Sequence, residues 1–481
     1  MNKYLYGAAV QGIQDFIFKT NELTHIVGAS ELVEQICTSA FDEFAKDGES
    51  IVRAAGNIKF VFNREEDCRK AVREFPQKVM SMAPGIIISQ AVVLADADFG
   101  KAVDKLEVLL KVQRNTPPRN VTLGLLGVKR ANSTGLPVVK IDESIYKDEP
   151  TVQKECYQNR TKLCKKSFGD IVISKGAFAY DIKDITGKND WIAVIHADGN
   201  GVGKIVQAVG KNKDIFQNFS LQLDMATSEA AQMAFNAVKD RFSDKKVIPI
   251  RPVVLSGDDM TVIIRGDLAL DYTNAFIRAF EEKTREHLGN ILRGQEVFAS
   301  GEDCLTACAG IAFIKSSYPF YYGYQLAEEL CSHAKKDTKA IYGATSNHLP
   351  PSCLLFHKVQ DSFIINYDDI VKRELTAQGG LSFKAGPYYT SPQAGKKTVD
   401  DLFDASKLLV SENGDGIKSG IRNWISLRLE DENKAAQRRE RMLQVFTDAT
   451  VVKQLTCEED KRCMAYDVLA YNTIMNQQTN E

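Results

Sequence analysis

The stretch WIAVIHADGNGVGK (191–204), together with VVLSGDDMTVII (253–264), decides the fold of this 481-residue chain. Both open as runs of β-branched and other apolar residues, which are typical of buried strands. The first run ends at Asp198, and the second breaks at Asp258-Asp259, in a turn between two short strands. Carboxylates therefore stand at two predicted strand ends. The glycines that follow the first are Gly199, Gly201 and Gly203.

The segments around these strands repeat one order twice. In the N-terminal part the pattern predicts strand 4–10, helices 13–18 and 29–44, two strands within 51–62, helix 65–80 and strand 85–94. From residue 190 it predicts strand 191–197, helix 220–242, strands 247–255 and 260–264, helix 271–288, strand 306–314 and helix 321–336. The order β-α-β-β-α-β is that of a ferredoxin-like unit. We therefore expect an α+β fold with two ferredoxin-like domains and a helical C-terminus.

The domain boundaries follow from these patterns. We expect a first Palm-like domain over 1–98, a connector or insertion over 99–188, a second Palm domain over 189–395 and a helical domain over 396–481. In the connector, residues 102–114 read as a helix and 169–181 as a short strand pair. In the helical domain, Ser419 is expected to cap the helix that holds Trp424.

Composition places the chain among ordinary globular proteins. Apolar residues make up 44% and the net charge is −2, so a nucleic-acid partner would need a local basic patch. The N-terminus has no secretory leader, and no apolar run approaches the ~20 residues of a membrane helix. A cytoplasmic protein with reduced thiols is expected. The ten cysteines contain no CxxC pair, which favours buried or incidental thiols over a zinc site.

The aspartates at the strand ends predict a metal site. In a β-α-β-β unit, the end of the first strand lies beside the hairpin that joins the next two. Asp198, Asp258 and Asp259 would then converge, and clustered carboxylates repel one another unless a cation lies between them. Mg²⁺ prefers oxygen ligands, and two such ions can activate a hydroxyl and stabilise leaving pyrophosphate. Groups expected to contact a nucleoside triphosphate are the three glycines already named, Ser256, Gly257, Lys204, Lys335 and Lys336.

Each motif also has a structural interpretation. Gly-Asp-Asp by itself is typical of a turn, and DGNG of a turn or a calcium-like loop. Their order, with each at a strand end, favours the metal site. His196 is more typical of a packed structural histidine than of a base. The Lys335-Lys336 pair, at the end of the predicted helix 321–336, fits both a helix cap and a phosphate contact.

Several stretches resemble the large Palm-domain polymerase/cyclase subunit of type III CRISPR effector complexes of the Cmr and Csm kind. VIHADGNGVGKI resembles its Asp-Gly-Asp-x-x-Gly-Lys element, and VVLSGDDMTVII its Gly-Gly-Asp-Asp hairpin. ACAGIAFIKSSYPFYYGYQLAEELCSHAKK resembles the strand and helix after that hairpin. GAAVQGIQDFIFKTNELTHIVGASELV (7–33) resembles the opening of the first Palm, and AGPYYT (385–390) the approach to the helical domain.

The resemblance implies a function and a site. Members of this family make cyclic oligoadenylate messengers from ATP at sites shared by two facing Palm domains. It implies that Asp198, Asp258 and Asp259 bind Mg²⁺ or Mn²⁺, with Gly28 and Ser30 of the first Palm contacting a nucleotide. It also implies antiviral defence and, as partners, RNA, CRISPR effector subunits or a second copy of the chain. No membrane partner is expected.

The sequence also departs from the family pattern. No His-Asp dipeptide occurs, so the resemblance is to a shortened form without the nuclease domain. NSTGLP (132–137) stands where a four-cysteine zinc module is expected. Asn200 replaces the second acid of the Asp-Gly-Asp element, and Ser256 replaces the first glycine of the hairpin. In the first Palm, residues 55–58 (AGNI) replace the acidic pair, so that domain is expected to be non-catalytic.

Three functions remain open at the level of sequence. The first is a Mg²⁺-dependent nucleotidyltransferase or cyclase that makes a cyclic or linear oligonucleotide messenger, with oligoadenylate as the expected product. The second is a catalytically weak Palm scaffold that binds nucleotide, RNA or partner subunits, which Asn200 favours. The third is a diguanylate-type cyclase, which the second Palm-like unit and the helical C-terminus disfavour.

Overall fold

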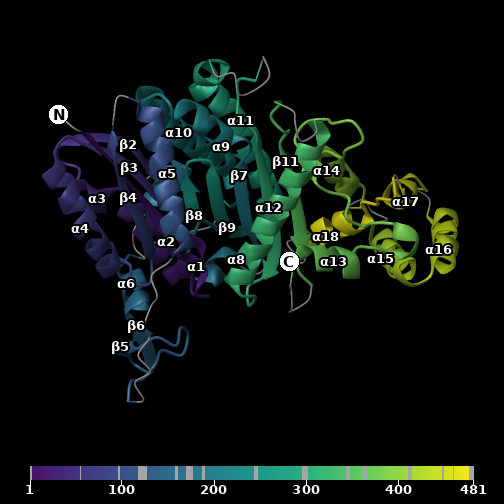
Figure 1. The fold of residues 1–481 in the computed structure, drawn as a ribbon. Helices are drawn as coiled ribbons and strands as arrows, with labels where there is room; N and C mark the ends of the chain where they lie inside the picture. The colour runs from purple at the N-terminus through teal and green to yellow at the C-terminus, as the bar shows by residue number, and fades with distance from the viewer. Residues whose placement is uncertain are drawn as a thin grey trace.

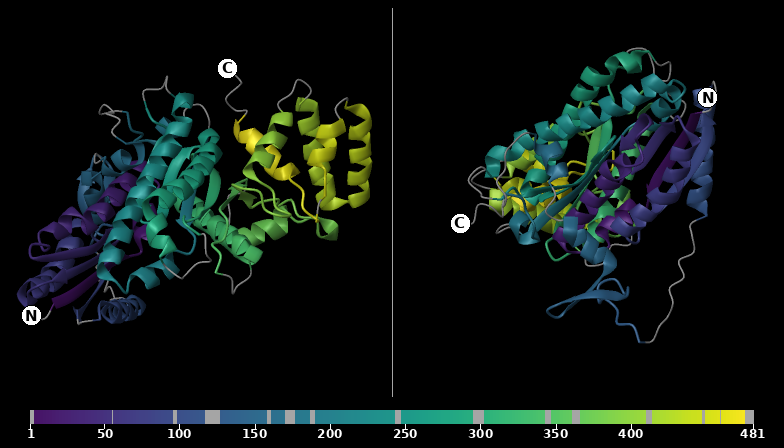
Figure 2. Two further views of the ribbon diagram at one scale, coloured as in Figure 1. Left: turned by 90° about the horizontal axis from the view of Figure 1, so that it is seen from above. Right: turned by 90° about the vertical axis from the view of Figure 1, so that its left-hand side faces the viewer.

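The computed structural model describes residues 3–54, 56–95, 98–116, 127–157, 161–169, 177–186, 190–242, 247–294, 302–342, 347–360, 366–409, 414–446, 449–458 and 460–475. Two β-sheets lie one after the other along the molecule, and a group of helices follows at the C-terminal end (Figure 1). Seen from above, the two sheet units adjoin each other and the C-terminal helices form a third body (Figure 2).

The first unit contains a four-stranded sheet in the order β2-β3-β1-β4 with antiparallel neighbours. Its elements are β1 (Lys3–Gln11), α1 (Ile13–Phe18), α2 (Leu23–Cys37), α3 (Ser39–Asp42), β2 (Gly48–Ala54), β3 (Asn57–Phe62), α4 (Glu65–Met82) and β4 (Ile87–Ala95). The strand order is that of a ferredoxin-like unit, because each β-α-β crossover leaves room for the strand inserted between its two strands.

The second unit repeats this order and extends it. Its sheet runs β12-β11-β10-β7-β9-β8, so the core β10-β7-β9-β8 matches β4-β1-β3-β2 of the first sheet. Its strands are β7 (Trp191–Gly199), β8 (Ile250–Ser256), β9 (Asp259–Arg265), β10 (Ala307–Lys315), β11 (Cys353–Lys358) and β12 (Tyr388–Tyr389). Its helices are α9 (Val202–Val209), α10 (Lys213–Val238), η1 (Lys239–Phe242), η2 (Gly266–Leu268), α11 (Ala269–Arg293), α12 (Phe320–Tyr342), α13 (Tyr367–Glu374) and η3 (Gln378–Gly380).

The remaining elements connect the units and complete the C-terminal part. Between the sheets lie α5 (Phe99–Asn115), β5 (Val138–Asp142), β6 (Ile145–Asp148), α6 (Glu149–Tyr157), α7 (Lys162–Phe168) and α8 (Ile182–Thr186). The C-terminal helices are α14 (Val399–Leu408), α15 (Gly414–Glu430), α16 (Glu432–Val445), α17 (Ala449–Leu455) and α18 (Ala465–Met475). The α+β class with two ferredoxin-like units and a helical C-terminus is confirmed, whereas the domain boundaries stay a prediction.

Several predicted helices have different ends in the structure, and three of them differ most. Instead of one helix over 29–44, α2 begins at Leu23 and is followed by the short α3, because the buried face already starts at Leu23 and Ile26. Helix α10 begins at Lys213 instead of 220, where the Asn212 side chain accepts two backbone N–H groups. Helix α12 runs to Tyr342, six residues beyond the predicted end.

The predicted cap at Ser419 is wrong. Ser419 lies inside α15, because Ile417, Ile421 and Trp424 are buried at helical spacing and continue the apolar face on both sides of the serine. Strands β11 and β12 were not predicted, since each is short and depends on pairing with a distant neighbour. Most of the predicted strand pair at 169–181 lies outside the described residues, and 177–181 contain no strand.

Three observations concern membrane helices, cysteines and metal-ligand groups. Over the described ranges, no helix combines the length and apolarity that crossing a membrane would require. All ten cysteines are free thiols. Two groups of described residues have the geometry of metal ligands, and neither of them contains a cysteine.

Candidate functional site

Backbone pairing brings Asp198 and Asp259 face to face. Strands β7 and β9 are antiparallel, with Asp198 as the register partner of Asp259 at the hairpin end of β9. Gly257 takes a φ of 63° in the turn, a left-handed conformation that suits glycine. Its carbonyl accepts a 2.5 Å hydrogen bond from the Thr227 hydroxyl on α10. The turn therefore places Asp258 beside the facing pair and is held from behind by a helix.

The three aspartates form one compact cluster. Each offers a carboxylate oxygen within 4.8 Å of the other two. Burial and the neighbouring Asp198 raise the pKa of Asp258 to about 7. Burial, Asp258 and Asp198 likewise raise the pKa of Asp259. Asp258 and Asp259 therefore keep their protons more readily than free carboxyl groups unless positive charge is supplied.

Lys335 supplies part of that charge. Its ammonium group forms an ion pair with Asp198 and donates a 2.9 Å hydrogen bond to the Gly199 carbonyl. Burial acts against the ammonium, but Asp198 outweighs it and raises the pKa of Lys335. One lysine balances one of three carboxylates, so the cluster keeps an excess of negative charge. Its three oxygen donors and this excess fit a hard divalent cation such as Mg²⁺.

The glycines after Asp198 have different roles. A Cβ atom on Gly199 would lie 2.9 Å from the Cβ atom of Asp258 and 2.9 Å from Val202, so Gly199 lets the hairpin approach β7. Gly201 is the N-cap of α9, with a φ of 75°. Gly203 and Lys204 are exposed in the first turn of α9, where free backbone N–H groups attract anions.

Asn200 points away from the acidic cluster. It is 1% exposed, and its amide group donates to the Thr306 hydroxyl at 3.1 Å and to Cys308 Sγ at 3.4 Å. Its side-chain oxygen has no hydrogen-bond partner among the described residues. The residue that replaces the second acid of the motif therefore packs towards β10. Asp198 and the hairpin pair remain as the candidate ligand set.

Ser30 lies across a cleft from the acids. A small cavity of about 60 Å³ is lined by Ser30 of α2, by Gln14 of α1, and by Ser256 and Asp259 of the second sheet. The two Palm-like units therefore both border the space next to Asp259. Gly28 lies elsewhere: a Cβ atom there would come within 1.8 Å of the Lys154 carbonyl. Close packing of α2 against α6 accounts for Gly28, and its contact with a nucleotide stays a prediction.

Helix α12 contributes two side chains, Lys335 and Tyr324, to this region. Lys335 was predicted, but it lies in the middle of α12, so the alternative of a helix-end cap is wrong for both Lys335 and Lys336. Lys336 is exposed and forms no hydrogen bond or ion pair with the cluster. Tyr324 was missed: its ring stacks on Phe18 of α1 at 4.6 Å. The sequence spacing could have identified Tyr324, because eleven residues make three helical turns and place Tyr324 and Lys335 on one face of the helix.

His196 is a packed histidine on the same face of β7 as Asp198. Its ring lies 5.7 Å from the Tyr324 ring, and Nδ1 is 3.2 Å from the Thr261 hydroxyl. Burial lowers the pKa of His196 to about 4, so the ring is neutral at pH 7. Stacked side chains from β7, α12 and α1 thus connect the two units beside the acids.

The described residues of the first unit contain no matching acidic cluster. Ala9 pairs with Asn57 at the end of β1, as Asp198 pairs with Asp259 at the end of β7. Gly12 follows as a left-handed N-cap of α1, as Gly201 does for α9. The backbone is therefore repeated, but Asp198 and Asp259 correspond to an alanine and an asparagine. Residue 55 of the predicted replacement AGNI lies outside the described residues.

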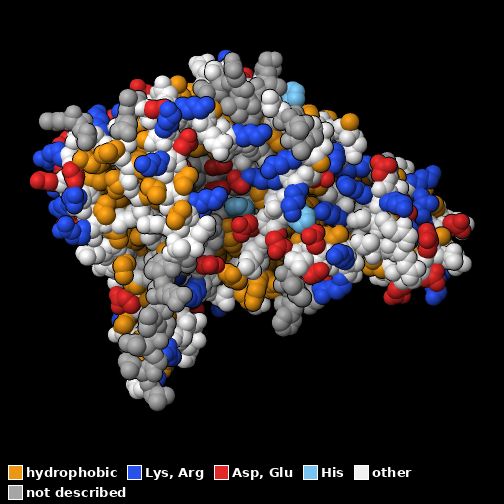
Figure 3. All heavy atoms as spheres, in the orientation of Figure 1, with side chains coloured by type: hydrophobic (Ala, Val, Ile, Leu, Met, Phe, Trp, Pro, Cys, Tyr) orange, Lys and Arg blue, Asp and Glu red, His pale blue; other side chains and the backbone are white. Residues whose placement is uncertain are grey.

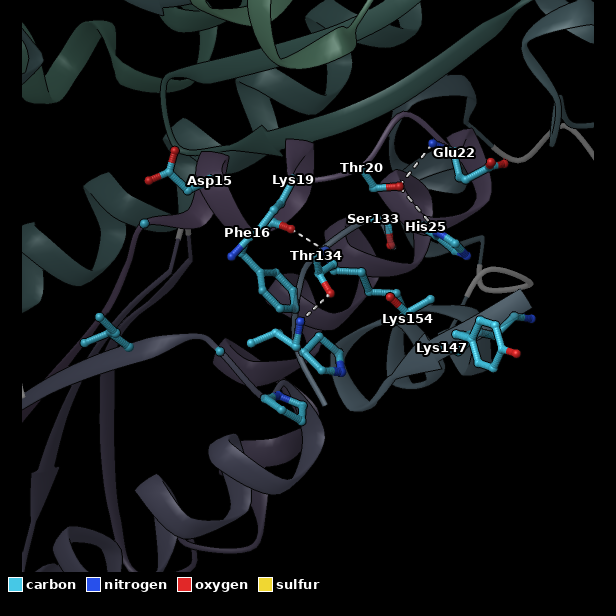
Figure 4. Close-up of a pocket in the computed structure, with 18 of the residues that line it drawn as sticks. Asp15, Phe16, Lys19, Thr20, Glu22, His25, Ser133, Thr134, Lys147 and Lys154 are labelled. Carbon is cyan, nitrogen blue, oxygen red and sulfur yellow. Dashed lines mark hydrogen bonds between the residues drawn. The ribbon is translucent and has the colours of Figure 1, made fainter. Parts of the chain in front are cut away.

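A larger cavity, of about 320 Å³, lies away from the acids (Figure 4). It opens between α1 and the β5–β6 hairpin and shares no lining residue with the cleft at Asp259. Lys154 crosses it from α6 and donates a 2.5 Å hydrogen bond to the Phe16 carbonyl in the last turn of α1. That bond caps a helix C-terminus, and Thr20 binds His25 and the Glu22 amide nearby. The size of this cavity therefore does not make it the centre of the chemistry.

Comparison with known proteins agrees with this geometry. Residues 191–341 match the family model described as Cas10/Cmr2, second palm domain. None of the curated proteins matches the chain. Among solved structures, the Csm1-Csm4 cassette in complex with cA4 is 12% identical, with a TM-score of 0.56 over 99% of this chain and 69% of that chain.

Two further structures extend the likeness. The Csm1-Csm4 cassette in complex with pppApApA is 13% identical, with a TM-score of 0.59 over 98% of this chain and 69% of that chain. Csm1 in T. onnurineus is 14% identical, with a TM-score of 0.54 over 98% and 70%. At this identity the structural likeness establishes the fold. Residues 191–341 are therefore similar to the second palm domain of Cas10/Cmr2, within a chain that has the fold of Csm1.

Proposed function

We propose that this protein is a Mg²⁺- or Mn²⁺-dependent nucleotidyltransferase that joins ATP into a cyclic or linear oligoadenylate messenger for antiviral defence. The observation that carries the proposal is the convergence of Asp198, Asp258 and Asp259 within 4.8 Å at the edge of a Cas10/Cmr2-type palm. Structures with the same fold are complexes with AMPPNP, pppApA and cA4, a series that fits substrate, intermediate and product.

The residues divide the work as follows. Asp198, Asp258 and Asp259 would hold the divalent cations, which when bound supply charge neutralisation at the phosphates and activation of the attacking hydroxyl. Lys335 holds Asp198 in place and adds a positive charge beside the transferred phosphate. The backbone N–H groups at the start of α9 point towards anionic oxygens. Ser30 and Gln14 face the acids from the first unit and help to orient the nucleotide.

A direct assay tests the proposal. The purified chain is incubated with each nucleoside triphosphate and Mg²⁺ or Mn²⁺, and products are identified by mass spectrometry. We expect oligoadenylates from ATP, and a loss of at least a hundredfold in Asp258→Ala and in Asp259→Ala. Glu229→Gln is the matched control, because it alters the other group with metal-ligand geometry, Glu229, Glu286 and His287. Undiminished product in both aspartate variants would contradict the proposal.

A Palm scaffold is the second candidate. The inward turn of Asn200 leaves the motif one acid short, which favours this function. In a scaffold, the acids and the cleft at Ser30 would bind nucleotide or RNA without turnover, and a subunit resembling Csm4 or a second copy would be the partner. Calorimetry with ATP and Mg²⁺ separates the two functions. Binding without product supports the scaffold, and product formation excludes it.

A further inference from the structure

A group of lysine and arginine side chains lies beyond Lys335 on the side of α12 that faces the C-terminal helices. We call Lys336, Lys384, Lys396 and Arg462 the basic surface. On the face shown in Figure 3, Lys and Arg side chains gather between the acidic side chains near α12 and the C-terminal helices. Lys336 follows Lys335 directly, so this surface begins one residue from the ion pair with Asp198.

Backbone contacts fix the members of the basic surface near one another. Ser382 forms a parallel bridge with Arg462, with a 2.8 Å bond from the Ser382 N–H to the Lys461 carbonyl. Lys384 lies two residues after Ser382, close enough to Arg462 for the guanidinium charge to lower the pKa of the lysine. The Lys384 ammonium lies 5.1 Å from the Tyr367 ring, which in turn is 5.1 Å from the His333 ring of α12.

The positive charge of this surface is only partly balanced. Lys396 pairs with Asp337 at 2.6 Å, and Asp368 lies 3.5 Å from His333. Among the described residues, the side chains of Lys336, Lys384 and Arg462 make no ion pair or hydrogen bond. Burial and the nearby Arg462 lower the pKa of Lys384. The nearby carboxylates that act on Lys384 are Asp337, which already pairs with Lys396, Asp368 and the buried Asp467. None of them forms an ion pair with Lys336, Lys384 or Arg462, which favours an anionic partner.

The backbone before Arg462 is strained. Asp460 and Lys461 have φ values of 46° and 59°, in the left-handed region that side chains other than glycine rarely adopt. Bonds from the Ser382 N–H to the Lys461 carbonyl and from the Cys463 N–H to the Ser382 carbonyl hold this turn. A strained turn that fixes an exposed arginine outside ion-pair distance of the described carboxylates is typical of binding sites.

We propose that the basic surface binds the phosphodiester backbone of a single-stranded oligonucleotide. Lys336, Lys384 and Arg462 would each neutralise a phosphate, and no base would be read, because the aromatic neighbour Tyr367 is buried. A chain lying here would run from the acids towards the C-terminal helices. The idea that the bound oligonucleotide is made at the acidic cluster rests on the proposed function. The binding of an oligonucleotide to the basic surface does not.

Fluorescence anisotropy with 5′-labelled A4 and A20 RNA tests the proposal on the full chain. EDTA is present throughout, so the assay does not depend on the acidic site. We expect Lys336→Gln/Arg462→Gln to weaken A20 binding about tenfold at low salt. The slope of log affinity against log salt concentration should become less steep by about 1.4, because each of the two lost phosphate contacts contributes about 0.7 for a single strand. If the unaltered protein also binds A4 and the double variant loses this binding to the same extent, the ligand is a chain of product length. If only A20 binds, the ligand is a longer RNA.

The matched control removes two lysines from α5 of the first unit. Lys105 and Lys111 of α5 are exposed and pair with no acid among the described residues. Lys105→Gln/Lys111→Gln should bind A20 as the unaltered protein does. Equal losses in both double variants, no loss in Lys336→Gln/Arg462→Gln, or no binding by the unaltered protein would each overturn the proposal. Thermal melting confirms that the variants are folded.

Discussion

Asp198 and Asp259 face each other across neighbouring strands, an arrangement that costs stability in a sheet because like charges oppose directly. Asp258 adds a third carboxylate within 4.8 Å. A structural role would not need this repulsion, since asparagine would keep the same turn. The positive charge of Lys335 offsets part of this repulsion, and a bound metal ion would offset the rest.

The first prediction concerns this repulsion. Asp259→Asn should raise the melting temperature by about 2 °C in EDTA, because it removes like charge at a cost in the unaltered protein of about 1 kcal/mol. It should also abolish the stabilisation that Mg²⁺ gives the unaltered protein. Differential scanning calorimetry with and without Mg²⁺ measures both effects. A variant that melts lower in EDTA, or that keeps the Mg²⁺ shift, would count against a metal site here.

The second prediction concerns Gly199. An added Cβ atom at Gly199 would lie 2.9 Å from Asp258, so Gly199→Ala should displace the hairpin and lower ATP turnover at least tenfold. The matched control is Gly127→Ala, which has no role in the site and where nothing lies within 4 Å of the added atom. It should leave turnover unchanged. Equal effects of the two substitutions would show that Asp258 does not depend on the close approach at Gly199.

At the scale of elements, α12 connects the site to the rest of the sheet. A Cβ atom on Gly310 of β10 would meet the Ala327 carbonyl at 1.9 Å, so this glycine lets α12 lie close against the sheet. The same helix carries Tyr324, which stacks on α1, and Lys335, which binds Asp198. The seating of one helix thus sets both the contact between the two units and the charge of the acidic cluster.

A third prediction belongs to the contact between α18 and β12. Asp467 of α18 is buried and accepts a 2.7 Å hydrogen bond from the Tyr388 hydroxyl. Burial raises the pKa of Asp467 to about 7, against about 4 in the unfolded chain. Between about pH 4 and about pH 7, Asp467 is therefore protonated in the folded state and ionised in the unfolded state. The stability from Asp467 is fully present below about pH 4 and is lost as the pH rises to about 7.

Comparison with Asp467→Asn isolates this contribution. The unfolding free energy of the unaltered protein minus that of the variant should fall by up to about 4 kcal/mol between pH 4 and 7.5. Urea unfolding at several pH values measures it. Asp404→Asn, which removes an exposed carboxylate from α14, is the control and should give a flat difference. A flat difference for Asp467→Asn as well would remove the pH dependence assigned to this contact.

For the whole molecule, the buried apolar residues form one continuous core from the first sheet to the last helix. Gly266, between the second sheet and α18, illustrates the continuity, because an added Cβ atom would lie 3.1 Å from Trp191 and 3.2 Å from Ile474. The two tryptophans of the chain lie in different parts of the molecule, because Trp191 begins β7 and Trp424 lies within α15.

The fourth prediction is that the sheet units and the C-terminal helices unfold together. Trp191→Phe leaves Trp424 as the reporter of the helices, and Trp424→Phe leaves Trp191 as the reporter of the second sheet. Urea transitions followed by the two fluorescence signals, each referenced to circular dichroism of the same variant, should coincide. An earlier transition at Trp424 would show that the C-terminal helices are a separate folding unit.

The sequence by itself determined the two ferredoxin-like units and the meeting of the three aspartates. Both follow from local rules: alternation along strands, turn residues at the hairpin and the order of elements. Pairing across a hairpin fixes which residues oppose each other, so Asp198 could be placed beside Asp258 and Asp259 from their positions at strand ends.

Only the tertiary structure decided what surrounds those acids. The Lys335 ion pair joins residues 137 positions apart, and Ser30 reaches the cleft at Asp259 through packing between the two units. Asn200 turns towards β10 because a neighbouring strand offers it partners, which no local pattern encodes. The basic surface likewise unites α12 with segments near 384 and 462. Contacts of this kind depend on how whole elements pack, and packing is set by the sum of many distant side chains instead of by any one motif.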